Sequence, residues 1–275
     1  GTTLPWSTTS SAGTCAPDDV VTLPRLDLLA EPVDATTAIV LAHGGRQSSQ
    51  SVPSDWGHPI LRMWPFADVA RANAPEALVG LVRYRHRGWN DRAAAKDLWG
   101  VLDAVGDDGV TTIALIGHSM GGRAVVATGD HPLVTGVLAL APWLPSGEPL
   151  VDLSGRFIVF AHGDRDRITS ARLTAEYVSR ARRQGLPVGL FSVAGESHAL
   201  LRRDGDWNEL VRRFVASTLC GEPDPELLGV VSDDPLHGAD ALPAWTAAGP
   251  SAGAVMAVGA ARLRLPLGRS IAADR

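Results

Sequence analysis

Gly117-His118-Ser119-Met120-Gly121 is the stretch of this 275-residue sequence that decides its fold. It directly follows the apolar run 112–116 and opens a segment of helical character at residues 122–124. A Gly-x-Ser-x-Gly pattern is common by itself, but between a buried strand and a helix it is typical of a sharp turn that exposes the serine hydroxyl. Glycines flank the serine because larger side chains would collide across the bend. The pattern predicts a strand–turn–helix unit with Ser119 as a nucleophile.

Short apolar runs alternate with longer segments of helical period along most of the chain. The predicted strands are residues 38–42, 78–84, 112–116, 137–141, 157–161 and 188–193. The predicted helices are residues 59–73, 91–105, 170–184 and 207–219. The strands are continuous apolar runs, as expected for strands covered on both faces. The alternation therefore predicts an α/β fold, with a mostly parallel central sheet and helices on both faces.

Composition divides the chain into three parts. Residues 1–20 are rich in Ser, Thr, Gly and Pro and are predicted to form a loosely held N-terminal arm. Residues 21–220 carry the strand and helix pattern and form the predicted catalytic domain. Residues 221–275 are rich in Ala, Gly, Pro and Asp without a strong period, and form a C-terminal extension whose role the sequence does not reveal. Within it, residues 252–267 could form a short helix or strand.

Charge and hydropathy exclude two classes of partner. The net charge of -5 provides no basic surface for nucleic acid. No run approaches the roughly 20 apolar residues of a membrane-spanning helix. A cytoplasmic location is slightly favoured, and secretion stays open because the sequence begins at Gly1 rather than at methionine. A disulfide between Cys15 and Cys220 also stays open, and neither cysteine lies in a motif for a nucleophile.

A glycine-rich turn, His43-Gly44-Gly45-Arg46, directly follows the apolar run 38–42. Such a turn can offer the backbone N–H of Gly45 toward the serine. Together with the N–H of Met120, it would stabilise the oxyanion of a tetrahedral intermediate. The alternative is an ordinary strand-to-loop turn without a catalytic role.

Acidic residues and a histidine follow two later strands. Asp164 and Asp166 come after the run 157–161, and we favour Asp166 as the acid that orients a base, with Asp164 bonding its own turn. A metal site built from these two aspartates and His162 would have poor geometry within five residues. His198 follows the run 188–193, so the chain order is serine, acid, histidine. This order is expected of α/β folds whose serine lies in a strand–turn–helix unit.

Four segments together resemble the α/β-hydrolase superfamily over roughly residues 36–220. They are LAHGG (41–45), LIGHSMGG (115–122), FAHGDRDRI (160–168) and AGESHALL (194–201). Within the superfamily, the chain is most similar to small dienelactone-hydrolase-like and esterase-like bacterial members. The resemblance implies Ser119 as nucleophile, Asp166 as acid, His198 as base, and Gly45 with Met120 as oxyanion hole.

The sequence departs from dienelactone hydrolases in having serine where they have cysteine, so their substrate is not carried over. The segment LAPWLP (140–145) also resembles cutinase-like enzymes that cleave polyesters. Only residues 142–155 separate two predicted strands there, which is too short for a cap domain. An open site is therefore expected, shaped by the loops 47–56 and 86–89.

Candidate residues for a substrate pocket lie in or beside these loops and the serine turn. They are Arg46, His118, Trp89 and Trp143. The tryptophans could line an apolar pocket, but each could equally pack in the core or at the rim.

The expected activity is hydrolysis of a small carboxylic ester through an acyl-enzyme, without a metal or organic cofactor. An acyltransferase, thioesterase, cyclase or peptidase with the same triad is an alternative, because the chemistry up to the acyl-enzyme is shared. A non-catalytic binding protein that kept the fold is another, since fold alone does not establish activity. The sequence leaves the oligomeric state open.

Overall fold

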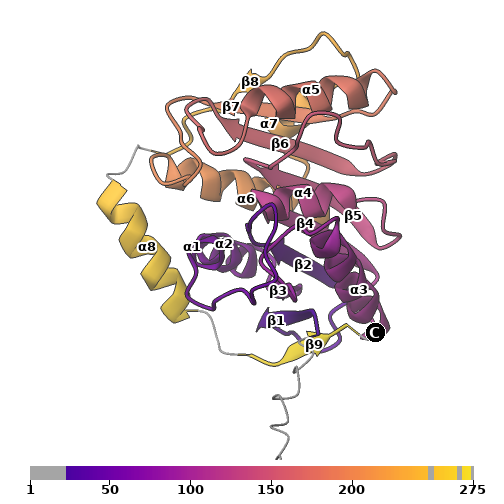
Figure 1. Cartoon of the computed structure of the whole chain (residues 1–275), viewed down its shortest axis with the longest axis vertical. Helices are drawn as coiled ribbons and strands as arrows, with labels where there is room; N and C mark the ends of the chain where they lie inside the picture. The colour runs from indigo at the N-terminus through magenta and orange to yellow at the C-terminus, as the bar shows by residue number, and fades with distance from the viewer. Residues whose placement is uncertain (1–22, 247–250, 265–267, 274–275) are drawn as a thin grey trace, which may run out of the picture.

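A nine-stranded sheet forms the centre of the computed structural model, which describes residues 23–246, 251–264 and 268–273 (Figure 1). The strands are β1 (Arg25–Ala30), β2 (Thr37–Ala42), β3 (Leu78–Arg83), β4 (Thr112–His118), β5 (Val134–Leu140), β6 (Phe157–Gly163), β7 (Gly189–Val193), β8 (Asp240–Ala241) and β9 (Ser270–Ala272). Their order is β8-β7-β6-β5-β4-β2-β3-β1-β9. Strands β2 to β8 pair in parallel, whereas β1 pairs antiparallel with β3 and β9. The predicted mostly parallel sheet is confirmed.

Helices cover both faces of the sheet, as predicted. They are α1 (His58–Leu61), α2 (Trp64–Asn73), α3 (Ala93–Asp107), α4 (Met120–Ala127), α5 (Ala171–Arg182), α6 (Asp204–Leu219), α7 (Pro225–Val230) and α8 (Ser251–Arg264). In β2, Ala38, Val40 and Ala42 belong to the apolar core shared with α3, α4 and α5, whereas Ile39 and Leu41 belong to the core under α2 and α6. Both faces of the strand are buried, which explains its continuous apolar run.

Two predicted helices begin differently in the structure. The segment 59–73 is divided into α1 and α2, each with a proline, Pro59 or Pro65, in its first turn. Proline suits the first turn of a helix but cannot donate the hydrogen bond that a continuous helix requires at its interior. The segment 91–105 starts only at Ala93, because Asp91 and Arg92 have positive φ angles of 54° and 68°.

The sheet continues beyond residue 220 at both of its edges. Strand β8 pairs with β7, and β9 pairs with β1, where Ile271 lies opposite Leu26. Next to β9, Ala273 is buried and its N–H donates to the carbonyl oxygen of Pro24 at 2.9 Å. Helix α8 packs on α2 at the periphery (Figure 1). The segment without a sequence period therefore supplies the two edge strands of the central sheet in the described chain.

Burial at the C-terminal edge yields a stability prediction. Replacing Ala273, which is 1% exposed, with aspartate places a carboxylate in the apolar core, and we expect the free energy of unfolding to fall by about 2–4 kcal/mol. Ala272→Asp, at an exposed position of β9 opposite Arg25, serves as the matched control and should lower it by less than about 0.5 kcal/mol. Urea denaturation measures both. Equal effects of the two variants would show that this edge contributes no buried core.

Candidate active site

Ser119 lies in the turn between β4 and α4 with an unusual backbone conformation. Its φ is 59° and its ψ is -119°, a region that residues with a side chain rarely adopt. The surrounding chain holds this conformation. The Ser119 N–H donates to the carbonyl oxygen of Leu140 at 3.1 Å, and the Ser119 carbonyl oxygen accepts from Trp143 N–H at 2.9 Å. The predicted sharp turn is present, and backbone contacts with the end of β5 fix it.

The two glycines of the motif are required by close backbone approaches. A Cβ atom on Gly121 would lie 2.0 Å from the carbonyl oxygen of Ala42 in β2. A Cβ atom on Gly117 would lie 2.3 Å from the carbonyl oxygen of Gly121. Both distances are far below van der Waals contact with atoms that cannot move aside, so the start of α4 can only approach the sheet this closely with glycine at these positions.

The structure brings together the three side chains that the sequence singled out. The His198 Nε2 atom lies 3.0 Å from Ser119 Oγ, and His198 Nδ1 lies 2.7 Å from Asp166 Oδ2. The three residues follow β4, β6 and β7, whose carboxyl ends meet at one edge of the parallel sheet. A hydroxyl, an imidazole and a carboxylate are thus linked in series by hydrogen bonds.

The Asp166 carboxylate is fully buried and surrounded by donors. Its Oδ1 atom accepts from the backbone N–H groups of Ile168 and Thr169 at 2.8 and 2.9 Å. Its Oδ2 atom accepts from Thr169 Oγ1 at 2.7 Å, His162 Nε2 at 3.2 Å and His198. Burial raises the pKa of Asp166, but the hydrogen bonds from His162, His198 and Thr169 outweigh it and hold the pKa below its usual range. The carboxyl group is therefore a stable anion beside His198.

Thr169 and His162 are site residues that the sequence reasoning did not assign. The Thr169 hydroxyl lies 3.1 Å from His198 Nδ1, and His162 Nδ1 lies 2.9 Å from Thr174 Oγ1. His162 stood in the motif but was considered only as a metal ligand. The sequence signal for its contact with Asp166 is the spacing of four residues. The turn after β6 brings the Asp166 side chain back to the end of that strand, where His162 lies.

Asp164 plays a different part from the one expected of it. It accepts the backbone N–H of Gly195 at 2.7 Å, across to the loop that carries His198, rather than bonding its own turn. Within the described ranges, no group of three or more His, Cys, Asp or Glu side chains is arranged to hold a metal ion.

The turn with the expected oxyanion donors packs against Ser119. A Cβ atom on Gly44 would lie 3.2 Å from Ser119 Cβ, and one on Gly45 would lie 2.6 Å from Met120 Sδ. Met120 is the first residue of α4, so its N–H has no acceptor within the helix. The oxyanion role of Gly45 and Met120 stays a prediction that this packing supports.

His118 lies beside His198 and is buried. Its Nε2 donates to the backbone carbonyl oxygen of His198 at 3.0 Å, and the two rings are 4.8 Å apart. Burial, with the charge of His198, lowers the pKa of His118 well below its ordinary value, so this ring is neutral. These contacts make His118 a support for the His198 loop, and its role in a substrate pocket stays a prediction.

Trp89 and Trp143 flank a guanidinium group. Arg123 of α4 lies 4.0 Å from the ring centre of Trp89 and 4.7 Å from that of Trp143, and it binds both carboxylate oxygens of Glu148 at 2.8 and 2.6 Å. Trp89 is buried, whereas Arg46 is exposed. The role of the two tryptophans and Arg46 in a substrate pocket stays a prediction.

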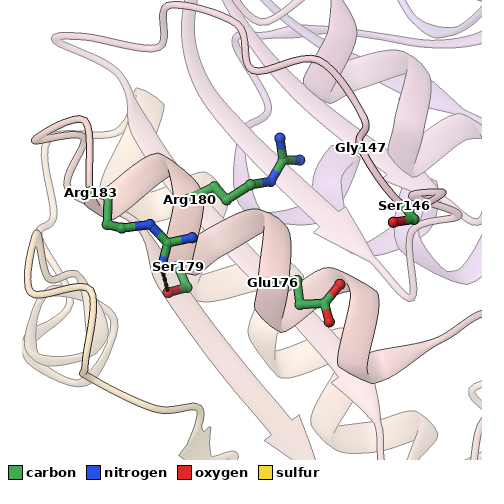
Figure 2. A pocket seen from close by; sticks show the side chains of 6 residues that line it. All are labelled: Ser146, Gly147, Glu176, Ser179, Arg180 and Arg183. Carbon is green, nitrogen blue, oxygen red and sulfur yellow. Dashed lines mark hydrogen bonds between the residues drawn. The ribbon is translucent and has the colours of Figure 1, made fainter.

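A hollow of about 190 Å³ lies beside the glycine-rich turn that packs against Ser119. It is lined by His43, Gly44, Pro53, Ser54, Gly57, His58, Pro59, Ile60 and Arg87. Gly44 connects it to the site, since a Cβ atom there would contact both Ser119 Cβ and Pro59 Cβ, at 3.2 and 3.5 Å. A second hollow, of about 300 Å³, lies between α5 and the loop after β5, and Figure 2 shows the Arg183–Ser179 hydrogen bond there. None of the three linked side chains lines either hollow.

Solved structures of other proteins share this architecture. Esterase Pf2001 from Pyrococcus furiosus is 14% identical with a TM-score of 0.54, covering 76% of this chain and 96% of that one. Esterase PE8 is 13% identical with a TM-score of 0.53, covering 72% and 99%. A serine hydrolase without a lid from Xanthomonas campestris is 17% identical with a TM-score of 0.50, covering 70% and 87%. No protein-family model and no curated protein matches the sequence.

The protein has the α/β-hydrolase fold. The nine-stranded sheet and the turn after β4 agree with this assignment. No helix lies between β5 and β6, where residues 141–156 form a loop, so the described chain has no helical cap at that point of the fold. The helices within the described residues are all too short or too polar to cross a bilayer. Cys15 lies outside the described residues, and Cys220 Sγ lies 3.7 Å from the carbonyl oxygen of Asn73.

The buried His43 predicts a pH dependence of stability for this hydrolase fold. Burial lowers the pKa of His43 from 6.5 to about 4, with Arg83 acting in the same direction and the Gly44 carbonyl oxygen opposing it. Between these two values the unfolded chain takes up a proton that the folded chain does not, so the free energy of unfolding falls as the pH is lowered. The difference in pKa corresponds to about 3 kcal/mol.

Urea denaturation between pH 7 and pH 4 measures this effect. In His43→Asn the fall in the free energy of unfolding should be smaller than in the wild type by about 3 kcal/mol. His58→Asn, at an exposed position of the same hollow, is the control and should leave the fall unchanged. A fall in His43→Asn as steep as in the wild type would contradict the prediction.

Proposed function

We propose that this α/β hydrolase cleaves carboxylic esters, with Ser119 as nucleophile, His198 as general base and Asp166 as the acid that orients it. The hydrogen-bonded series from Ser119 Oγ through His198 to Asp166, at 3.0 and 2.7 Å, is the observation that carries the proposal. A serine hydroxyl needs a base within hydrogen-bonding reach to become a nucleophile, and the base needs a partner that fixes its tautomer. Similarity of fold to esterases supports the reaction class.

The proposed reaction has two steps. His198 Nε2 takes the proton of Ser119 as Oγ attacks the ester carbonyl carbon, and the backbone N–H groups of Gly45 and Met120 stabilise the oxyanion. The C–O bond to the alcohol breaks, and the alcohol leaves with the proton from His198. Water then attacks the acyl-enzyme, giving its proton to His198, and the acid leaves as Ser119 regains its proton. Asp166 stabilises the imidazolium form of His198 in both steps, and no cofactor takes part.

Size and access favour a small ester as substrate. The hollow of about 190 Å³ beside Gly44 accommodates a short acyl or alcohol group. The loop between β5 and β6 forms no cap over the site.

Removal of the nucleophile is the direct test of this function. We expect Ser119→Ala to lower kcat on p-nitrophenyl acetate by about four to six orders of magnitude and to abolish labelling by a fluorophosphonate, while the circular dichroism spectrum stays unchanged. Ser146→Ala, in the exposed loop after β5, is the control and should behave as the wild type. Equal labelling of wild type and Ser119→Ala would place the reactive nucleophile elsewhere, and a wild type without labelling or turnover would instead favour a non-catalytic binding protein.

The two aspartates of the β6 loop provide a matched pair. Asp166→Asn should lower kcat by about four orders of magnitude. The amide can turn its N–H₂ group toward His198 Nδ1, which favours the wrong tautomer of the imidazole. Asp164→Asn keeps an oxygen for the N–H of Gly195, and its kcat should fall by less than about tenfold. Steady-state kinetics on the same ester compares them. A larger loss in Asp164→Asn would reassign the acid.

A further inference from the structure

Glu196 is a fully buried carboxylate in the loop that carries His198. Its carboxylate accepts five hydrogen bonds. The Oε1 atom accepts from the N–H of Ser197 at 2.7 Å and from Ser197 Oγ at 3.4 Å. Its Oε2 atom accepts from the N–H groups of Arg202 and Arg203, at 3.0 and 2.9 Å, and from Trp207 Nε1 at 3.2 Å. One side chain thus ties together both ends of the turn around His198 and the first turns of α6.

The backbone of Glu196 connects this turn to the Asp166 loop. The Glu196 carbonyl oxygen accepts from the N–H of Arg165 at 3.0 Å. It also lies 2.4 Å from the position of a Cβ atom on Gly163, so only glycine allows this approach at the end of β6. The loops with the imidazole and the carboxylate are therefore fixed to each other at Glu196, independently of the His198–Asp166 hydrogen bond.

The rest of the turn has few other polar anchors. Leu200 has a positive φ of 56°, and its carbonyl oxygen accepts from Arg62 Nη2 at 2.7 Å. The carbonyl oxygen of His198 accepts from His118. Burial lowers the pKa of Arg62 to about 10, and the negative charge of Glu196 opposes this lowering. A turn with a strained residue needs such anchors, because the strain would otherwise be released by a different loop conformation.

We propose that Glu196 is a positioning residue, whose carboxylate holds the His198 turn so that Nε2 stays within hydrogen-bonding distance of Ser119 Oγ. The inference rests on the proposed function of His198 as base. A carboxylate is required because each of its oxygens faces donors, and an amide would turn an N–H₂ group toward at least one of them. Glu196 itself touches neither Ser119 nor a substrate.

The test compares Glu196→Gln with Glu209→Gln, a glutamate of α6 that is paired with Arg212 and Arg213. In Glu196→Gln, kcat on p-nitrophenyl acetate should fall by about 100-fold, since a displacement of about 1 Å in a catalytic group has an effect of this size. KM should stay within about twofold, because substrate contacts are unchanged. Glu209→Gln should keep the wild-type kcat. A wild-type kcat in Glu196→Gln would overturn the proposal, as would equal loss in both variants.

Hydrogen exchange reports on the turn itself. The amides of Ser197, Arg202 and Arg203 should exchange faster in Glu196→Gln than in the wild type, with no change at Ile168 and Thr169. Unchanged exchange at the first three amides would overturn the proposal. If Glu196→Gln does not fold, Glu196→Asp replaces it, since the shorter side chain keeps the carboxylate but cannot reach all five donors. A wild-type kcat in Glu196→Asp then has the same meaning.

Failure of the proposed function would look different. If the wild-type protein and Ser119→Ala hydrolyse the ester equally, the function of Ser119 and His198 is refuted, whatever Glu196 does. In that case the exchange rates still decide whether Glu196 holds the turn. If hydrolysis depends on Ser119 and Glu196→Gln changes neither kcat nor exchange, only the inference on Glu196 is refuted.

Discussion

The strained backbone of Ser119 is the constraint on which the rest of the site depends. Its φ of 59° reverses the chain between β4 and α4 within one residue. The reversal requires glycine two residues before and two residues after it, at Gly117 and Gly121, because a Cβ atom there would collide with nearby backbone. This turn presents Oγ at the sheet edge and starts α4 directly beside it. Strain of this kind persists only where neighbouring contacts over-determine the conformation. Here the contacts come from Leu140 and Trp143 at the end of β5.

Strand β5 connects the serine to the other two groups. It lies between β4 and β6 in the sheet, so the loops after β6 and β7 must reach across its end to meet Ser119. The carbonyl oxygen of Ala141 lies 3.3 Å from Thr169 Oγ1, and the Ala141 N–H donates to the carbonyl oxygen of Ala161 at 2.8 Å. The loop 141–156 after β5 contains no helix. It therefore does not obstruct the place where the loops after β6 and β7 reach Ser119.

Buried polar groups hold the loops rigid. Asp166 accepts from five donors, three side chains and two backbone amides, and Glu196 also accepts from five. Each carboxylate is taken out of water, so an incomplete donor set would be costly. Complete sets instead fix the loops in one conformation. The parallel sheet positions the starts of the loops, and the carboxylates of Asp166 and Glu196 hold His198 in place between them.

The features that could be predicted from the amino-acid sequence are those that depend on local sterics and on the burial of strands. The Gly117–Gly121 pattern, the continuous apolar strands and the chain order of Ser119, Asp166 and His198 were sufficient for the fold and for the three linked residues. The groups that surround Ser119, Asp166 and His198 became apparent only from the tertiary structure. Thr169, His162 and Glu196 depend on contacts between loops, and no local pattern encodes such contacts. Strands β8 and β9 are short edge strands, whose hydrogen-bonding partners β7 and β1 exist only once the sheet has formed.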